Sequence, residues 1–512
     1  MLVTGASLLI AVGHASTERR SGIFKVAALG RGVTMDPQVA YTSTAWGLEY
    51  ATAAKLFNYP DRRGAGGARL VPEVAKSFRI SKGGRKYTFL IRRGFRFSDG
   101  TPVRAKNFAY ALRRILSPKL RSPAAQFITE PYGGIYVTGF KARGLKLVVW
   151  LRNPSGRFLP YLSMPFFQAT STKLPLGREV TEVHKMNEIP SAGPYALTYN
   201  DQGRTTRIRR NPYYGGSRPH TVRGATVFWN RDEHKAFLQT LKGKYDRFTV
   251  PPGYACSRDK CHRQRFEVRP LSCVGYAAFN NRKGLFSRNP AMRKAVSWAL
   301  SRRDYANQAG KYLASPWTHL LPPGFPGSIT KKKLQPYAAK SDYAKARRIA
   351  AGHFKDGKII VVYQDWGDVG PRQKDVVIRD LIRLGFKSED ISTIGSPEYG
   401  EPERWDLWIS LGWCQDYPDP YDFFQLLLGT SSHSYLPNAK YRAAIVKAGR
   451  LLGRARLKAF GKLDLKIMRN VAPLAVMRTY NSVDLFSKRV DRRSLVWNGV
   501  YSDWSIPALR LK

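Results

Sequence analysis

The segment from Leu411 to Pro420, LGWCQDYPDP, gathers a tryptophan, a cysteine, two aspartates and two prolines. The carboxylates of Asp416 and Asp419 can hold a cation, and Cys414 can form a disulfide bond. Asp and Pro are also residues that turns prefer, so a plain turn explains both aspartates equally well. Because this acidic and aromatic segment belongs to a chain of net charge +50, it is the first candidate for a binding site.

Other motifs that carry chemistry are incomplete. Residues 352–358, GHFKDGK, resemble a phosphate-binding loop, but Ile359 stands where such a loop needs Ser or Thr, and a strand pattern follows instead of a helix. The spacing of Cys256, Cys261 and His262 differs from a haem-attachment motif, and no second ligand cluster accompanies it. No nucleophile is paired with a base. We therefore expect no enzyme activity, no catalytic residue, no metal and no cofactor.

The cysteines indicate an oxidising compartment. They are even in number, which favours disulfide bonds outside the cytoplasm. The short spacing favours a local disulfide between Cys256 and Cys261 over a metal site. Together with Cys273 and Cys414 they allow three pairings, and the residues alone do not choose among them.

Strand and helix patterns alternate along the chain, which favours α/β lobes. Ligands of open α/β sheets bind beyond the ends of strands. A strand pattern ends just before the segment that holds Asp416, so we expect this residue at such a crevice. The expected strands are 24–29, 87–91, 358–363 and 405–411, and the expected helices are 105–116 and 371–384.

The length of 512 residues favours two or three lobes. Residues 1–15 are apolar and end in a small-x-small pattern, so we expect them to be a secretory signal segment. No later run reaches the ~18 apolar residues that a membrane span needs. The expectation is an exported, extracytoplasmic protein.

The charge balance is strongly basic, with 86 Lys and Arg residues against 36 Asp and Glu residues. Such a balance raises nucleic acid or another anionic polymer as a partner. The basic residues are scattered over the whole length, however, and no nucleic-acid-binding motif accompanies them. We therefore expect no nucleic acid and a cationic surface near an anionic cell envelope, with binding of an anionic polymer as the alternative.

Several segments together resemble one family, the extracytoplasmic solute-binding proteins of ABC transporters, in the dipeptide, oligopeptide and nickel-binding group. The most specific match is residues 87–112, YTFLIRRGFRFSDGTPVRAKNFAYAL. The matches span residues 24 to about 425 in the order of the family. The other matching segments are Met35-Asp36-Pro37, residues 69–78, residues 191–195 (SAGPY), Phe279-Asn280-Asn281 with residues 293–302, and residues 412–420.

The resemblance implies an α/β, periplasmic-binding-protein-like fold with two lobes, a hinge and an extra subdomain on the first lobe. Lobe I is expected at residues 22–272 and 482–512, and lobe II at residues 273–481, because the family's chain crosses the hinge near Phe279. The family implies a monomer that binds peptides and delivers them to an ABC transporter permease, and that meets the membrane only by docking to this permease. Nickel chelates, glycans or other solutes are the alternatives on the same scaffold.

The resemblance also implies a ligand site between the lobes. In oligopeptide-binding members, the aspartate that matches Asp416 holds the free amine of the peptide, and a buried ammonium needs such a carboxylate. Extended segments of both lobes hold the peptide backbone. Trp413 suits either a pocket wall or the core. The matching ligand-binding positions are Asp416, Gly412, Trp413 and Cys414 in lobe II, and Tyr41, Thr42 and Ser43 in lobe I.

Some oligopeptide-binding members join this segment by a disulfide to residues just before the Phe279 motif. The resemblance therefore implies a Cys273–Cys414 disulfide, which leaves Cys256–Cys261 as the second pair. Asp419 lies between two prolines, which hold its backbone extended. We expect Asp419 to shape the turn and Asp416 to recognise the ligand.

Overall fold

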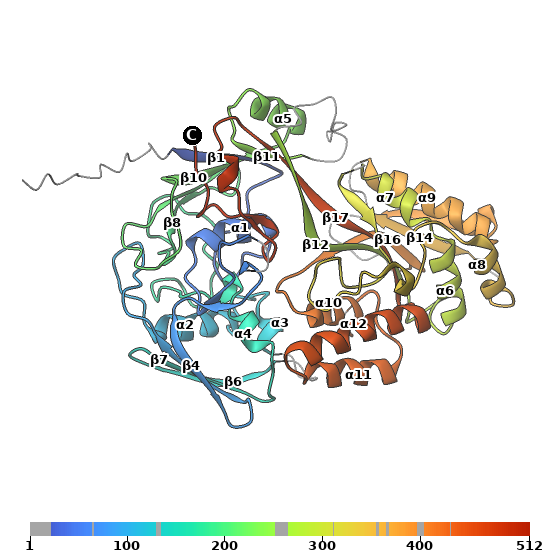
Figure 1. The fold of residues 1–512 in the computed structure, drawn as a ribbon, viewed down its shortest axis with the longest axis horizontal. Coiled ribbons are helices and arrows are strands. Elements are labelled where there is room, and N and C mark those ends of the chain that lie inside the picture. The colour runs from blue at the N-terminus through green and yellow to red at the C-terminus, as the bar shows by residue number, and fades with distance from the viewer. Residues whose placement is uncertain are drawn as a thin grey trace, which may run out of the picture.

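The computed structural model describes residues 22–63, 66–129, 135–250, 265–310, 312–354, 358–364, 368–396, 404–430 and 432–512. The expected signal segment at residues 1–15 and the expected Cys256–Cys261 disulfide lie outside these residues. Figure 1 shows two lobes joined by two long strands, β12 (Phe266–Phe279) and β17 (Leu474–Phe486). The two-lobed α/β fold that the sequence implied is confirmed.

One sheet runs through both lobes. In the second lobe β17 pairs with β12, and at its C-terminal end it pairs with β11 of the first lobe, so it carries the sheet from one lobe into the other. The strand β13 (Ala314–Pro316) also pairs with β17. In order of pairing, the strands are β15 (Ile391–Ser396), β14 (Ile359–Gln364), β16 (Leu407–Cys414), β12, β17, β11 (Arg247–Thr249), β1 (Ile23–Leu29), β10 (Gly224–Asn230), β9 (Thr205–Arg210) and β8 (Tyr195–Asn200).

The first lobe contains residues from both ends of the chain. Phe24, Phe486 and Trp504 belong to one hydrophobic core, and the C-terminus lies beside β1 in Figure 1. The helices α1 (Ser43–Thr52) and α5 (Glu233–Leu241) belong to this lobe. Because β12 and β17 each extend into both lobes, the expected lobe bounds stay a prediction.

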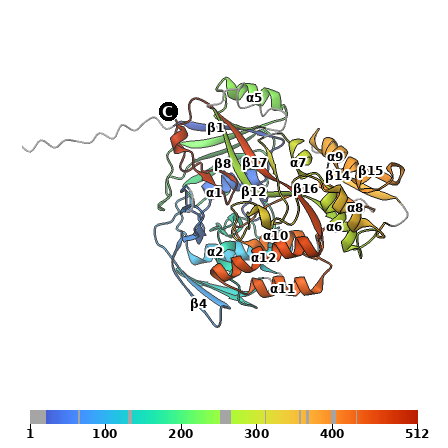
Figure 2. The same cartoon turned by 45° about the vertical axis from the view of Figure 1, so that its right-hand side comes forward.

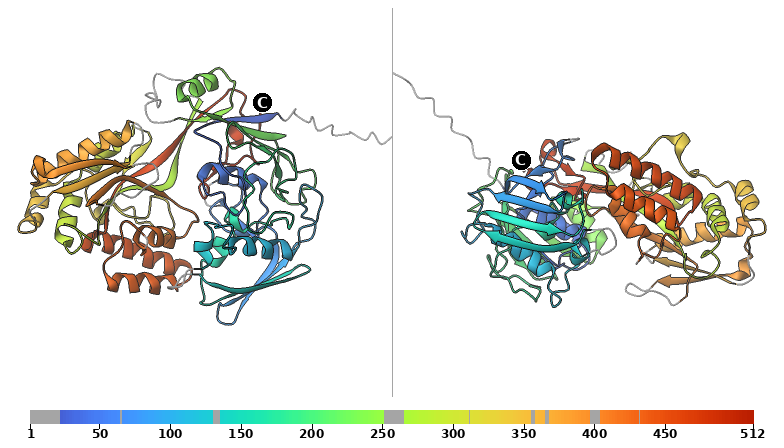
Figure 3. Two further views of the ribbon diagram at one scale, coloured as in Figure 1. Left: turned by 180° about the vertical axis from the view of Figure 1, so that it is seen from behind. Right: turned by 90° about the horizontal axis from the view of Figure 1, so that it is seen from below.

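A second, four-stranded antiparallel sheet forms the outer part of the first lobe, as Figure 3 shows in its right-hand view. Its helix α2 (Ala105–Ile115) packs against the strands and closes a core that includes Phe89, Phe108 and Val149. The short helices α3 (Ala125–Ile128) and α4 (Phe158–Tyr161) complete this part. The strands, in order of pairing, are β4 (Ala75–Ser81), β5 (Lys86–Ile91), β7 (Lys146–Leu151) and β6 (Val137–Arg143).

Helices cover both faces of the sheet in the second lobe, in two groups that Figures 1 and 2 show apart. Tyr276 packs into the core under one group, and the next residue, Ala277, packs into the core under the other. This alternation follows from the pleat of a strand that is buried on both faces. One group is α6 (Pro290–Ala299), α7 (Arg302–Asn307), α8 (Tyr343–Ala350) and α9 (Val369–Leu384), and the other is α10 (Pro420–Leu428), α11 (Ala439–Gly449) and α12 (Gly453–Asn470). Among the described helices, none has the length and apolar character that a bilayer span requires.

The strand β16 differs from the sequence expectation. It was expected at residues 405–411, but it runs from Leu407 to Cys414, so Gly412–Cys414 form a strand and not a loop. Antiparallel pairing with β12 extends it by these residues. The remaining expected elements lie within two residues of β1, β5, β14, α2 and α9 at both ends. The short strands β2 (Phe57–Asn58), β3 (Val71–Pro72), β18 (Trp497–Asn498) and β19 (Asp503–Trp504) complete the described strands.

Candidate ligand-binding site

A disulfide fixes the end of β16. Cys414 and Cys273 lie directly opposite each other on β16 and β12, with a Cα–Cα distance of 4.0 Å, and they form a disulfide bond. This is the pairing that the family resemblance implied, and it is confirmed. The bond holds the segment that carries Asp416 against the long strand that joins the lobes.

The part of β16 that leads up to the disulfide has an open edge. The strand β14 pairs with Leu407–Ile409 only, so in the described part of the chain no strand covers that side of β16 further along. The Gln415 N–H donates to the carbonyl of Ser272 on β12 at 3.0 Å. Backbone groups alternate in direction along an antiparallel strand, so those of Gly412 and Cys414 point away from β12. Both residues are exposed, and their outward N–H and C=O groups are available to another chain.

A cleft of about 450 Å³ lies between the first lobe and the disulfide. Ser43 at the start of α1 and Cys414 both line it, so two of the predicted site residues meet there. Thr42 has a structural role, because its hydroxyl accepts a hydrogen bond from the Ala45 N–H at 3.2 Å and caps α1. The cleft also contains Arg247 and Asp503, an ion pair that the sequence analysis did not identify.

Asp416 contacts the first lobe through Tyr41. The Tyr41 hydroxyl donates to Asp416 Oδ2 at 2.7 Å, and the aspartate is only 5% exposed. Burial raises the pKa of Asp416 to about 7, while the hydrogen bond from Tyr41 opposes this rise. The Asp416 N–H donates to Asp422 Oδ2 at 2.8 Å, and burial holds the pKa of Asp422 well above its usual range. Within the described ranges, no basic side chain forms an ion pair with Asp416.

Asp419 is held quite differently. Its carboxylate accepts hydrogen bonds from Arg456 Nε at 2.9 Å and Nη2 at 2.6 Å. It also accepts from the Tyr421 N–H at 2.9 Å, which caps the start of α10. The expectation that Asp419 shapes the turn is therefore confirmed.

Other contacts of this loop were not predicted. The Tyr417 and Tyr161 hydroxyls lie 3.3 Å apart, and their ring centroids are 4.6 Å apart. The Gln415 side chain donates to the Val500 carbonyl at 3.1 Å. These contacts join the loop to the first lobe, and no local pattern around Tyr161 could have indicated them. Trp413 is half-buried and packs against the second-lobe core, and in the described structure its Nε1 has no hydrogen-bond partner.

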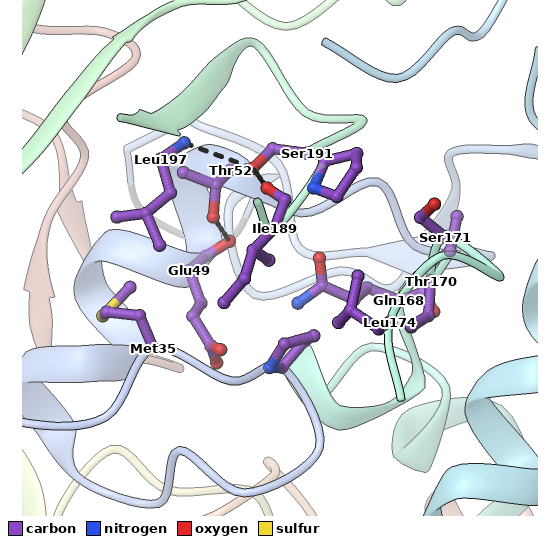
Figure 4. A pocket seen from close by; sticks show the side chains of 13 residues that line it. Met35, Glu49, Thr52, Gln168, Thr170, Ser171, Leu174, Ile189, Ser191 and Leu197 are labelled. Atoms are coloured by element: carbon purple, nitrogen blue, oxygen red, sulfur yellow. Dashed lines mark hydrogen bonds between the residues drawn. The ribbon is translucent and has the colours of Figure 1, made fainter. Parts of the chain in front are cut away.

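A much smaller cavity lies inside the first lobe, away from β16. Figure 4 shows Glu49 facing it from α1, together with Gln168, Thr170 and Ile189. Neither carboxyl oxygen of Glu49 has a partner among the described residues, and burial followed by the charge of Asp36 raises its pKa well above the usual range. A volume of about 10 Å³ has room for about one water molecule, so this cavity cannot hold a peptide. Across the described ranges, no group of three or more His, Cys, Asp or Glu side chains is arranged to hold a metal ion.

A family of known proteins matches most of the chain. Residues 69–435 match the family described as bacterial extracellular solute-binding proteins, family 5, middle part. The matched range includes Cys273, Gly412 and Asp416, but it begins after Tyr41.

Individual relatives are more distant. The probable deoxycholate-binding periplasmic protein YgiS of Escherichia coli K12 is 26% identical over 467 residues, covering 86% of this chain and 85% of the relative. The oligopeptide-binding protein OppA of Bacillus subtilis 168 is 21% identical, covering 69% and 68%. Among solved structures, clavulanic acid biosynthesis oligopeptide binding protein 2 has a TM-score of 0.83 at 20% identity, covering 97% and 96%. This last similarity shows the fold.

Proposed function

Because the chain belongs to the bacterial extracellular solute-binding proteins of family 5, we propose that it captures peptides outside the cytoplasm and delivers them to an ABC transporter permease. Relatives named as oligopeptide-binding and murein peptide-binding proteins support a peptide as the ligand. A relative named for deoxycholate and another named for haem show that the family also serves other solutes. The choice of a peptide therefore depends on the site itself.

The open edge of β16 supports recognition of a peptide backbone. An extended peptide beside Gly412 and Cys414 adds one strand to the sheet, and its backbone groups pair with the outward N–H and C=O groups. Such pairing depends on no side chain of the peptide. The ligand side chains then point to either face of the sheet, as in any strand.

Asp416 supports recognition of the free amine, and it is the observation that carries the proposal. A buried carboxyl that lacks a cation partner and whose pKa is raised to about 7 gains most from an ammonium group. An ammonium has three donors, so it can replace the Tyr41 hydroxyl or share the carboxylate with it. Binding of the cation shifts Asp416 to its ionised form and releases a proton when the solution pH is near 7 or below.

Calorimetry with short peptides tests this function. Tetra-alanine with a free amine is expected to bind, and N-acetyl-tetra-alanine, which has no ammonium, is expected to bind far more weakly. Asp416→Asn keeps the shape and removes the charge, so it is expected to weaken binding of the free-amine peptide by about 2–5 kcal/mol. Asp375→Asn is the matched control, because it removes the same charge from a side chain that is 70% exposed on α9.

The outcomes separate the alternatives. If acetylated and free peptides bind the parent protein equally well, the amine mechanism fails and another solute becomes the ligand. If Asp375→Asn weakens binding as much as Asp416→Asn, general charge and not the site controls affinity. Binding that falls steeply with salt for any anionic polymer would favour the polymer alternative instead.

A further inference from the structure

Arg478 on β17 is buried without an anionic partner. It is 5% exposed, and in the described structure its Nε and Nη1 atoms have no hydrogen-bond partner. Its Nη2 donates to the Tyr480 hydroxyl at 3.3 Å. No carboxylate of the described residues forms an ion pair with it. A buried guanidinium with open donors is costly unless an acceptor completes the site.

Other buried arginines of this protein have a carboxylate or a backbone carbonyl as acceptor. Arg114 pairs with Asp36 at 2.7 Å, and Arg456 pairs with Asp419. Arg302 has no carboxylate, but it donates to the backbone carbonyls of Val476 and Ser297 at 2.8 Å each. Arg302 also has an open donor at Nη2, but Arg478 differs because the described residues give it neither a carboxylate nor a backbone carbonyl as acceptor.

Two glycines bring Arg478 close to the open edge of β16. Arg478 pairs with Gly275 of β12, and Gly275 pairs with Gly412 of β16. A Cβ atom on Gly275 would lie 2.8 Å from Arg478 Cγ, and one on Gly412 would lie 2.9 Å from the Tyr480 hydroxyl oxygen. The side chains of Arg478 and Tyr480 therefore extend across β12 toward β16, over positions where any larger residue would clash.

The same sheet face leads to the cleft. Cys273 and Cys414 lie two positions from Gly275 and Gly412 along their strands, so they share the face on which Arg478 lies. Both cysteines line the cleft of about 450 Å³. Arg478 therefore lies next to the cleft, two residues along the strands from the cysteine pair and further into the second lobe.

The surroundings of Arg478 suit an incoming carboxylate. The guanidinium carbon lies 4.5 Å from the Tyr480 ring centroid and 5.7 Å from that of Tyr305. These rings orient the cation and exclude water but supply no negative charge. A guanidinium with two open N–H groups matches a carboxylate better than it matches a neutral acceptor, because the pair forms charge-assisted hydrogen bonds.

We infer that Arg478 is an anion subsite that receives the carboxylate of the ligand whose amine Asp416 holds. The inference rests on the proposed function, and it narrows the ligand to a short zwitterion. Gly412 lies opposite Gly275, which in turn lies opposite Arg478. Gly412 precedes Asp416 by four residues. At about 3.3 Å per extended residue the two anchors are at most ~13 Å apart along the strand, which is the span of a peptide of roughly four residues.

Calorimetry with tetra-alanine and its C-terminal amide tests this inference. The parent protein is expected to bind the free acid about tenfold or more tightly than the amide, because only the acid pairs with the guanidinium. Arg478→Gln is expected to lose this preference by weakening binding of the acid alone. Arg303→Gln is the matched control, because it removes the same charge from an exposed residue of the same lobe and should keep the preference.

Three results would overturn the subsite: equal binding of acid and amide by the parent protein, equal weakening of both by Arg478→Gln, or a preference in Arg478→Gln that matches the parent. If Arg478→Gln does not fold, Arg478→Lys keeps the charge without the two-pronged geometry, and it is expected to reduce the acid preference without abolishing it. N-acetylation separates the two hypotheses. If acetylation abolishes binding while amidation has no effect, only the role of Arg478 fails; if acetylation has no effect, the proposed function fails.

Discussion

Asp416 and Asp419 stand three residues apart in one loop, and their surroundings differ in one decisive way. Both are buried, yet Asp419 has a guanidinium and a helix N-terminus as partners, whereas Asp416 has a tyrosine hydroxyl from the other lobe. The Asp419 carboxylate is already neutralised by Arg456, so its role is limited to stabilising the fold. The Asp416 carboxylate keeps its capacity to bind a cation. The comparison teaches that the partners of a buried carboxylate, and not its residue type, decide whether it can still take up a cation.

The largest effect is expected from removing Asp419. Asp419→Ala leaves Arg456 buried without its carboxylate and removes the cap of α10, so the free energy of unfolding should fall by about 3–5 kcal/mol. Urea denaturation measures this loss. The folded fraction should bind tetra-alanine as the parent does. A variant that keeps its stability and loses binding would reverse the roles of the two aspartates.

The next effect is a pH dependence that belongs to Asp416. Its pKa of about 7 in the folded protein exceeds the usual value of 3.8, so the folded protein keeps a proton that the unfolded chain loses. The contribution of this group to stability therefore falls as the pH rises from about 4 to about 7, by up to about 1.4 kcal/mol per pH unit. The free energy of unfolding of Asp416→Asn should depend less steeply on pH in this window.

Denaturation of both proteins at pH 5, 6, 7 and 8 measures this difference. Asp464 also has a pKa raised to about 7 by burial, but it is present in both proteins and cancels in the difference. A free-energy difference between parent and Asp416→Asn that stays constant from pH 5 to pH 8 would show that Asp416 titrates normally.

The smallest effect is expected from Tyr41→Phe. The change removes the hydrogen bond that favours the ionised form of Asp416, so the pKa of this carboxyl should rise further. Stability should fall by about 0.5–1.5 kcal/mol, the usual net contribution of one hydrogen bond. Carbon-13 NMR of the Asp416 carboxyl measures the pKa directly, and a lower pKa in the variant would contradict this account.

The sequence allowed much of the fold to be predicted, because apolar periodicity is local and the family motifs are long. The Cys273–Cys414 pair also followed from the resemblance. The end of β16 was missed by three residues, since pairing with β12 and not the composition of Gly412–Cys414 sets it. The contact between Tyr41 and Asp416 joins residues 375 positions apart. Their order in the chain says nothing of how the side chains meet, nor that Arg478 would lack a partner.

The position of β17 in the sheet has a consequence for how the chain is made. This strand lies between β12 and β11, yet residues 474–486 follow both neighbours far along the chain. Until residues 474–486 leave the ribosome, β12 and β11 each have one unpaired edge. Such edges are sites of aggregation. Neither half of the protein can complete its sheet early. Both parts of the sheet wait for β17, so a truncation that removes β17 should leave two unfinished lobes and not one finished lobe.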